Sequence, residues 1–232
     1  MYKTILLKLS GEAMGNEQGP FDFDFLNALS LQIKTLAEDG IGIGIVVGGG
    51  NICRGRIFEQ LGLDREKSDY IGMEATVMNA QTLEAALLKN GVKAKALSAI
   101  EVQNVENYSS ERAKELIAAG VVAVFGGGTG KPFFSTDTAS AIRASEIEAD
   151  VILMAKNGTD GVYDKDPNKY NDAVRFDEMK FDDIIDMKLG VIDLAAAEIC
   201  RDHKIKAFVF DMAEPDNIIK AARSEAVGTL IK

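Results

Sequence analysis

Short apolar runs alternate along the chain with longer stretches in which apolar positions recur every three or four residues. Runs such as 43–47 and 121–125 are almost continuously apolar, which is typical of strands buried on both faces of a sheet. In stretches such as 26–36 the apolar side chains share one side of a helix. The expected strands cover residues 5–9, 43–47, 94–97, 121–125, 151–154 and 207–210, and the expected helices cover residues 26–36, 69–90, 110–117, 136–148, 191–203 and 215–225.

Strands and helices follow each other in regular alternation, which predicts parallel strands joined by crossover helices. The expected fold class is therefore α/β, a three-layer α/β/α sandwich around a central, mostly parallel sheet. No linker, low-complexity tract or shift in composition divides the chain, so we expect a single domain over residues 1–232. The two halves echo each other, because residues 46–50 and 124–128 are each a buried strand followed by three glycines.

The charge balance narrows the choice of partners. The chain has 26 Lys and Arg against 36 Asp and Glu, a formal net charge of −10. Such an acidic chain does not suit sequence-independent binding to nucleic acid or docking on anionic lipid, since both need a cationic surface. No apolar run approaches the length of a membrane span, and the first residues do not form a secretion signal. We therefore expect neither a nucleic acid nor a membrane as a partner.

The cysteine and histidine content argues against a His/Cys metal site. Cys53 and Cys200 lie far apart in the sequence, and His203 is the only histidine. His203 falls at the polar end of an expected helix, where an ordinary surface role explains it. Two separate cysteines without a signal peptide suit a reducing cytosol, so we expect a cytoplasmic protein.

Glycine follows three of the expected strands. It occurs within residues 9–12, 48–51 and 126–130. The carboxyl ends of parallel strands meet at the sheet edge where ligands bind. Glycine lets backbone N–H groups approach an anion closely, and successive N–H groups form a concave anion site. Tight turns would explain one such loop, but three at strand ends predict a polyphosphate or two phosphorylated ligands that face each other.

Two common nucleotide motifs do not match these loops. After Gly130 and Lys131 comes Pro132, where a P-loop needs Ser or Thr, and Phe125 stands where its first glycine belongs. The dinucleotide pattern G-x-G-x-x-G reaches Cys53 where its third glycine should stand. We therefore do not expect a nicotinamide or flavin cofactor.

Charged side chains near the loops have the chemistry that phosphoryl transfer requires. Lys8 ends the first expected strand in an almost wholly apolar run, where its ammonium group would face phosphate oxygens. Arg54 follows the second glycine loop and offers a planar fork for phosphate, and Asp137 comes shortly after the third loop. Asp193 either caps a helix or holds a lysine, and the sequence leaves both readings open. The turn-rich loop 157–167 could cover a purine base and hold a ribose.

A series of motifs along the whole chain gives a more specific indication. The series comprises residues 8–13, 48–51, 54–55, 72–73, 75–79, 127–130, 132–137, 160–163, 166–167 and 187–203. With these motifs the chain resembles the bacterial UMP kinases (uridylate kinases), a branch of the amino acid kinase superfamily. The resemblance implies the amino acid kinase-like fold. It also implies transfer of the γ-phosphoryl group of ATP to UMP, giving UDP and ADP, in pyrimidine nucleotide biosynthesis.

The resemblance implies roles for individual residues. The ATP-binding residues would be Lys8, Leu9, Ser10, Gly11, Gly50, Arg54, Asn157, Tyr163 and Asp166. The UMP-binding residues would be Gly49, Asp69, Thr129, Gly130, Lys131, Pro132, Phe133, Phe134, Ser135 and Thr136. The catalytic residues would be Lys8, Asp137 and Asp193, with Asp193 orienting the lysine. Whether Lys156 or Asn157 faces the nucleotide stays open. The acceptor side would lie mainly in the N-terminal half and the ATP side mainly in the C-terminal half.

The resemblance further implies a homohexamer and a Mg²⁺ ion bound through the nucleotide phosphates, with no metal site of the protein's own. Residues 15–20 align with a segment linked to activation by GTP, and UTP is the expected inhibitor. The acceptor atom is a phosphate oxygen that is already ionised near neutral pH, so no general base is required. Two alternatives stay open: a related enzyme that phosphorylates a carboxylate or carbamate, and a non-catalytic nucleotide-binding protein.

Overall fold

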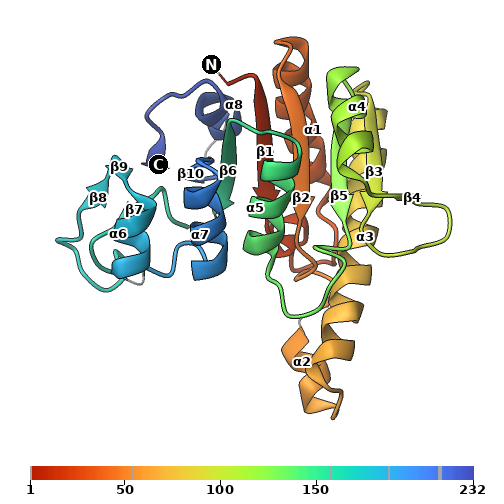
Figure 1. Cartoon of the computed structure of the whole chain (residues 1–232), viewed down its shortest axis with the longest axis horizontal. Helices are drawn as coiled ribbons and strands as arrows, with labels where there is room; N and C mark the ends of the chain where they lie inside the picture. Colours follow the sequence, from red (N-terminus) through yellow and green to blue (C-terminus); the bar gives the residue numbers. More distant parts are fainter. Residues whose placement is uncertain (1, 54, 157, 188, 214–215) are drawn as a thin grey trace.

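A nine-stranded sheet forms the centre of the molecule (Figure 1). The computed structural model describes residues 2–53, 55–156, 158–187, 189–213 and 216–232. The strand order is β4-β3-β5-β2-β1-β6-β10-β11-β9. Neighbouring strands are parallel except β10 and β11, which are antiparallel. The mostly parallel sheet predicted from the sequence is confirmed.

The long strands occupy the middle of the sheet, and two-residue strands form its margins. The strands of the main sheet are β1 (Thr4–Leu9), β2 (Gly42–Val47), β3 (Ala94–Ser98), β4 (Glu106–Asn107), β5 (Val122–Gly126), β6 (Val151–Lys156), β9 (Glu178–Met179), β10 (Lys206–Asp211) and β11 (Gly228–Ile231). A separate antiparallel ribbon pairs β7 (Val162–Tyr163) with β8 (Arg175–Phe176).

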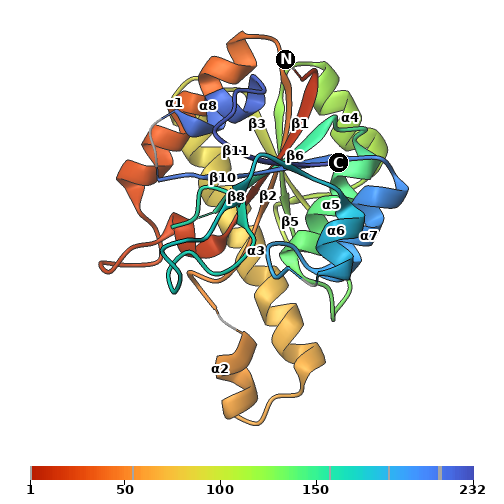
Figure 2. The ribbon, with the colours of Figure 1, turned by 90° about the vertical axis from the view of Figure 1, so that its left-hand side faces the viewer.

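Helices cover both faces of the sheet (Figure 2). One face carries α1 (Phe23–Glu38), α3 (Arg65–Lys89) and α8 (Asn217–Ala222). The other carries α4 (Ser110–Ala118), α5 (Thr136–Glu146), α6 (Phe181–Asp186) and α7 (Leu194–Asp202). A 3-10 turn, η1 (Gly11–Met14), follows β1, while α2 (Gly55–Gln60) and the first turns of α3 project beyond the sheet. The three layers are those that the sequence predicts.

Side chains alternate between the two cores along β1, the middle strand of the sheet. Ile5, Leu7 and Leu9 pack beneath α1 and α3, whereas Leu6 packs beneath α5 and α7. All four are completely buried. Successive side chains of a strand point to opposite faces, so Lys8 lies on the same face as Leu6 and reaches towards α5. Lys8 is therefore a buried lysine near the carboxyl end of the central strand, among apolar neighbours.

Two helices begin away from their expected positions because of their caps. The carboxylate of Asp64 accepts a hydrogen bond from the N–H of Lys67, so α3 begins four residues before the expected residue 69. In the same way Asp193 accepts from the N–H of Ala196, and α7 begins only after it. Asp193 therefore acts as a helix cap, one of the two readings that the sequence left open.

The pattern of hydrophobic positions did not predict several short strands. The strands β4, β7, β8 and β9 have two residues each, which is too short for a periodicity to show. The last helix spans Asn217–Ala222, inside the expected 215–225, and residues 214–215 lie outside the described residues. None of the described helices is long and apolar enough to cross a membrane.

Candidate active site

The first two glycine loops are packed backbone to backbone at the carboxyl edge of the sheet. A Cβ atom on Gly11 would lie 2.4 Å from the N atom of Gly50 and 2.7 Å from the O atom of Gly48. The N–H of Gly48 donates to the carbonyl of Leu9 over 2.9 Å. Any larger side chain at position 11 would force the two loops apart, so glycine is required here for close approach. The expectation that these loops share one edge is confirmed.

The third glycine loop follows β5, the neighbour of β2, and rests on α3. A Cβ atom on Gly126 would lie 2.7 Å from the Cα atom of Val77. The N–H of Gly127 donates to the hydroxyl of Thr76 over 2.7 Å. Gly127 and Gly128 have φ angles of +78° and +55°, a left-handed conformation that favours glycine. The chain therefore turns sharply above the sheet and continues into the segment before α5.

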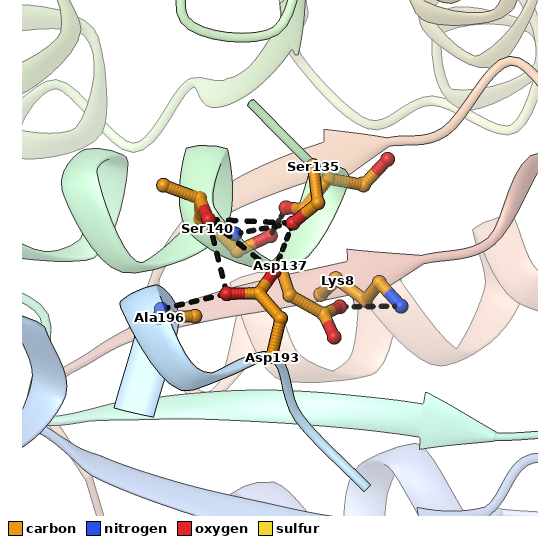
Figure 3. Close-up of polar contacts among 8 residues, drawn as sticks. Lys8, Ser135, Asp137, Ser140, Asp193 and Ala196 are labelled. Carbon is orange, nitrogen blue, oxygen red and sulfur yellow. Dashed lines mark hydrogen bonds and ion pairs between the residues drawn. The ribbon is translucent and has the colours of Figure 1, made fainter. Parts of the chain in front are cut away.

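Lys8 and Asp137 form an ion pair beside the first two glycine loops (Figure 3). The Nζ atom of Lys8 lies 2.9 Å from Oδ1 of Asp137, and the two side chains are 10 % and 17 % exposed. Lys8 comes from the end of β1, and Asp137 comes from the first turn of α5. The carboxylate holds the ammonium group in place, and both side chains keep only a small solvent-exposed fraction.

Lys156, the last residue of β6, adds a second positive charge beside this pair. Burial is the main cause that lowers the pKa of Lys156, the charge of Lys8 lowers it further, and Asp137 opposes both effects. The side chain of Lys156 thus feels the electrostatic field of both members of the pair. The open choice between Lys156 and Asn157 is not resolved by this, because Asn157 lies outside the described residues.

Asp193 joins the starts of two helices (Figure 3). It accepts from the N–H of Ala196 over 2.8 Å at the start of α7, and from the hydroxyl of Thr138 over 3.1 Å. It also accepts a hydrogen bond from the hydroxyl of Ser135, the residue that caps α5. Among the described residues the acidic partner of Lys8 is Asp137, so Asp137 and not Asp193 makes the contact that we expected to orient the lysine.

A cavity of about 350 Å³ opens between the second glycine loop, α3 and the segment before α5. Its lining includes six of the residues expected to bind UMP: Gly49, Asp69, Lys131, Phe134, Ser135 and Thr136. Gly50, expected on the ATP side, also lines it, as do Met73, which belongs to the motif at residues 72–73, and Cys53, for which the sequence indicated no role in binding. The expected acceptor residues from distant parts of the chain are therefore brought together around one cavity.

The backbone of Phe133 contacts Asp69, one of the residues that line this cavity. Its N–H donates to Oδ2 of Asp69 over 2.7 Å, although Phe133 has a φ angle of +71°, which is unusual for a residue with a side chain. The ring of Phe133 is largely exposed, and the guanidinium of Arg65 lies 5.5 Å from its centre. Thr129, Gly130 and Pro132 belong to the same loop as Phe133.

The residues expected to hold adenosine lie around the β7–β8 ribbon. The hydroxyl of Tyr163 donates to Oδ1 of Asp160 over 2.6 Å, and Arg175 contacts Oδ2 of the same carboxylate over 2.6 Å. Burial raises the pKa of Asp160, but Tyr163 and Arg175 outweigh it and lower the pKa below its ordinary value. Arg175 comes from β8, so no sequence spacing could have paired it with Asp160. Asp166 lies in the same loop and pairs with Lys169 over 3.1 Å.

Two of the expected ATP contacts cannot be placed. Arg54 and Asn157 lie outside the described residues. Among the other expected ATP contacts near the sheet, Leu9 is the last residue of β1, and Ser10 and Gly11 form the turn that follows it. Leu9 directly follows Lys8, so the expected phosphate contacts and the ion pair share one strand end.

Comparisons with known proteins give a consistent result. The model of the amino acid kinase family matches residues 3–211. A UMP kinase from Bacillus anthracis has a TM-score of 0.96 and 35% identity, with coverage of 100% of this chain and 96% of that chain. A UMP kinase from Ureaplasma parvum has a TM-score of 0.95 and 36% identity, with coverage of 100% and 99%. A uridylate kinase from Archaeoglobus fulgidus has a TM-score of 0.77 and 32% identity, with coverage of 98% and 99%.

Proposed function

The chain belongs to the amino acid kinase family, and from this we propose that it transfers the γ-phosphoryl group of ATP to UMP, giving ADP and UDP. The two UMP kinases that match at full coverage support UMP as the acceptor. The observation that carries the proposal is the buried pair of Lys8 and Asp137 beside the first two glycine loops. Two polyanions can meet only where positive charge and backbone N–H groups are concentrated.

Lys8 is the residue that we assign to the moving phosphoryl group. Phosphoryl transfer depends on in-line positioning and on neutralising charge in the transition state, with little covalent work for the protein. Asp137 keeps the ammonium group of Lys8 fixed, so it need not reorganise as the reaction proceeds. The attacking oxygen of UMP is already ionised near neutral pH. Asp137 is therefore a holder of the lysine in this mechanism and not a general base.

UMP would occupy the cavity between α3 and the loop 127–136. Its ribose hydroxyls would bind Asp69, whose carboxylate lines the cavity, and its phosphate would approach Gly49. ATP would place its phosphates on the turn after β1 and its adenosine beside Tyr163 and Asp166. In this arrangement the γ-phosphoryl group and the acceptor oxygen meet beside Lys8.

We propose that Mg²⁺ is bound by the nucleotide phosphates and water, as is common for enzymes that use ATP. In the described part of the chain no three His, Cys, Asp or Glu side chains cluster as metal ligands. Bound in this way, Mg²⁺ would neutralise part of the phosphate charge. Lys8 and the backbone N–H groups of the loops would supply the rest from the protein.

A coupled assay of ADP release with a panel of acceptors tests the proposed function. The panel is UMP, CMP, acetylglutamate, aspartate and carbamate, each with ATP and with or without Mg²⁺. We expect rapid ADP release with UMP and Mg²⁺, and release close to the no-acceptor background with the carboxylates and carbamate. Turnover with a carboxylate or carbamate and none with UMP would refute the proposal. Tight nucleotide binding without any ADP release would point to a non-catalytic protein.

We also propose a cytoplasmic homohexamer that responds to GTP and UTP. Exposed apolar side chains of α1 and α3, namely Phe23, Met78 and Leu88, support association through these helices. A groove of about 240 Å³ between the same helices could receive part of a second copy. Sedimentation equilibrium would measure the assembly, and a monomer at micromolar concentration would contradict it.

A further inference from the structure

A buried arginine lies beneath the third glycine loop, outside the residues that we assigned to either nucleotide. Arg143 belongs to the last turn of α5 and is only 4 % exposed. Its Nη2 atom donates to the carbonyl oxygen of Gly128 over 3.0 Å, and its Nη1 atom donates to Oε2 of Glu146 over 2.5 Å. The guanidinium therefore bridges its own helix and the loop that leads into the proposed UMP cavity.

Tyr108 holds this guanidinium from a third side. The guanidinium carbon lies 3.8 Å from the centre of the Tyr108 ring, which also packs edge-on against Phe125 of β5. The hydroxyl of Tyr108 donates to the same Glu146 oxygen over 2.5 Å. Burial, followed by this hydrogen bond, raises the pKa of Tyr108 well above its ordinary value, so the phenol keeps its proton and stays a donor.

A buried guanidinium is unfavourable unless its charge and its donors are matched. Here Glu146 matches the charge and Tyr108 covers the face, which leaves a rigid donor aimed at Gly128. On the other side of the loop, the N–H of Gly127 donates to Thr76 of α3. Two consecutive loop residues are therefore fixed from opposite helices. The glycines do not restrain the loop by their own conformational preference, because glycine has the greatest backbone freedom of all residues.

We infer that Arg143 is a positioning residue for the acceptor nucleotide, because its guanidinium holds the loop at Gly128 in the conformation that receives UMP. The inference rests on the proposed function, since it names UMP as the ligand of that loop. Lysine could not replace Arg143 fully, because a single ammonium group lacks the planar fork that serves Glu146 and Gly128 at once. Arg143 does not line the proposed UMP cavity, so its effect would pass through the backbone.

The variant Arg143→Lys tests the inference through a split between the two substrates. We expect the KM for UMP, and the dissociation constant for UMP measured by calorimetry, to rise about tenfold, the effect of losing one charge-assisted hydrogen bond. The KM for ATP should stay within about twofold of the wild type. Arg223→Lys is the matched control, because Arg223 pairs with Asp39 at a distant surface over 2.8 Å. It should leave both KM values unchanged.

The outcomes separate this inference from the proposed function. A wild-type protein that neither binds nor phosphorylates UMP refutes the function, and the inference falls with it. An active wild type with an Arg143→Lys variant of unchanged UMP affinity, or with equal losses for UMP and ATP, refutes the inference alone. If Arg143→Lys does not fold, Glu146→Gln serves instead, since it weakens the hold on the guanidinium and keeps the side-chain shape. It should raise the KM for UMP by a smaller factor and leave that for ATP unchanged.

Discussion

At the scale of single residues, the main feature is that the ammonium group of Lys8 is a buried charge, which needs a partner. Lys8 lies near the end of a strand whose other buried side chains are all apolar, and its exposed fraction is only 10 %. A buried charge is tolerated only with a partner, and Asp137 supplies it at 2.9 Å. The pair is therefore stable without ligand and ready to meet phosphate.

Replacing Lys8 tests its assignment directly. Lys8→Ala should lower kcat by about 10²- to 10³-fold, the effect of losing one preorganised group that stabilises transition-state charge. Steady-state kinetics with UMP and ATP measures the effect. Lys206→Ala is the control, because Lys206 is an exposed lysine at the start of β10 and should turn over like the wild type. Wild-type turnover by Lys8→Ala would show that the assignment is wrong.

Lys156 should reduce stability in the absence of nucleotide. Its pKa is lowered by burial and by Lys8, so between that pKa and its ordinary value the folded chain binds fewer protons than the unfolded chain. The free energy of unfolding should therefore rise with pH through that window. Lys156→Met should raise Tm at pH 7, by about 2–4 °C for each kcal/mol recovered, and should flatten the rise towards alkaline pH.

Calorimetric melts at pH 7 and at alkaline pH would measure this effect. Lys93→Met, a change at an exposed lysine, should leave both Tm values nearly unchanged. A lower Tm for Lys156→Met than for the wild type at pH 7 would contradict the expected effect of Lys156.

The two aspartates show what the sequence could and could not predict at this scale. Both Asp137 and Asp193 stand at helix starts, but only Asp193 was expected to orient Lys8. Which one reaches the lysine depends on how α5 and α7 pack on the sheet, and no local pattern contains that information. The same limit applies to Arg143, whose partners Tyr108 and Gly128 are 35 and 15 positions away along the chain.

At the scale of elements, the starts of α5 and α7 are joined by Asp193. One carboxylate accepts from the N–H of Ala196, and from the hydroxyls of Ser135 and Thr138. A helix start has free N–H groups and a partial positive charge, so a shared carboxylate stabilises both helices. The segment of the proposed acceptor site before α5 is thereby tied to α7.

Asp193→Ala should therefore cost more stability than the loss of an ordinary cap. We expect about 2 kcal/mol in the free energy of unfolding, against about 1 kcal/mol for Asp22→Ala, because Asp22 caps only α1. Urea unfolding followed by circular dichroism would measure both. Equal losses for the two variants would mean that the hydroxyl contacts of Asp193 add nothing to its cap.

The predictability of elements follows their length and burial. The six long central strands were predicted within one or two residues at each end, because a strand buried on both faces must be continuously apolar. The marginal strand β11 and the two-residue strands were missed, since they depend on pairing with partners that only the tertiary fold supplies.

At the scale of the whole molecule, an acidic chain is proposed to bind two polyanions. The net charge is −10, so attraction must come from a small region and not from the average surface. The glycine loops and Lys8 lie together at one edge of the sheet, and that arrangement could be predicted because the carboxyl ends of parallel strands meet at one edge. The cavity beside them could not, because its shape depends on side chains from α3 and from the loop before α5.

Ligand-induced stabilisation should report this local attraction. UMP at about 100 times its dissociation constant should raise the free energy of unfolding by about 2.7 kcal/mol. Uridine at the same concentration lacks the phosphate and should raise it far less. Thermal melts with each ligand provide the measurement. Equal stabilisation by uridine and UMP would mean that the phosphate contributes nothing to binding.

The central place of β1 also bears on how the polypeptide is made. β1 lies between β2 and β6, and β6 begins only at residue 151. During synthesis one edge of β1 must therefore wait, unpaired, until residues 151–156 have left the ribosome. Such an edge invites pairing with other nascent chains. The strand that carries Lys8 is thus translated well before β6, and its second edge is paired only when β6 arrives.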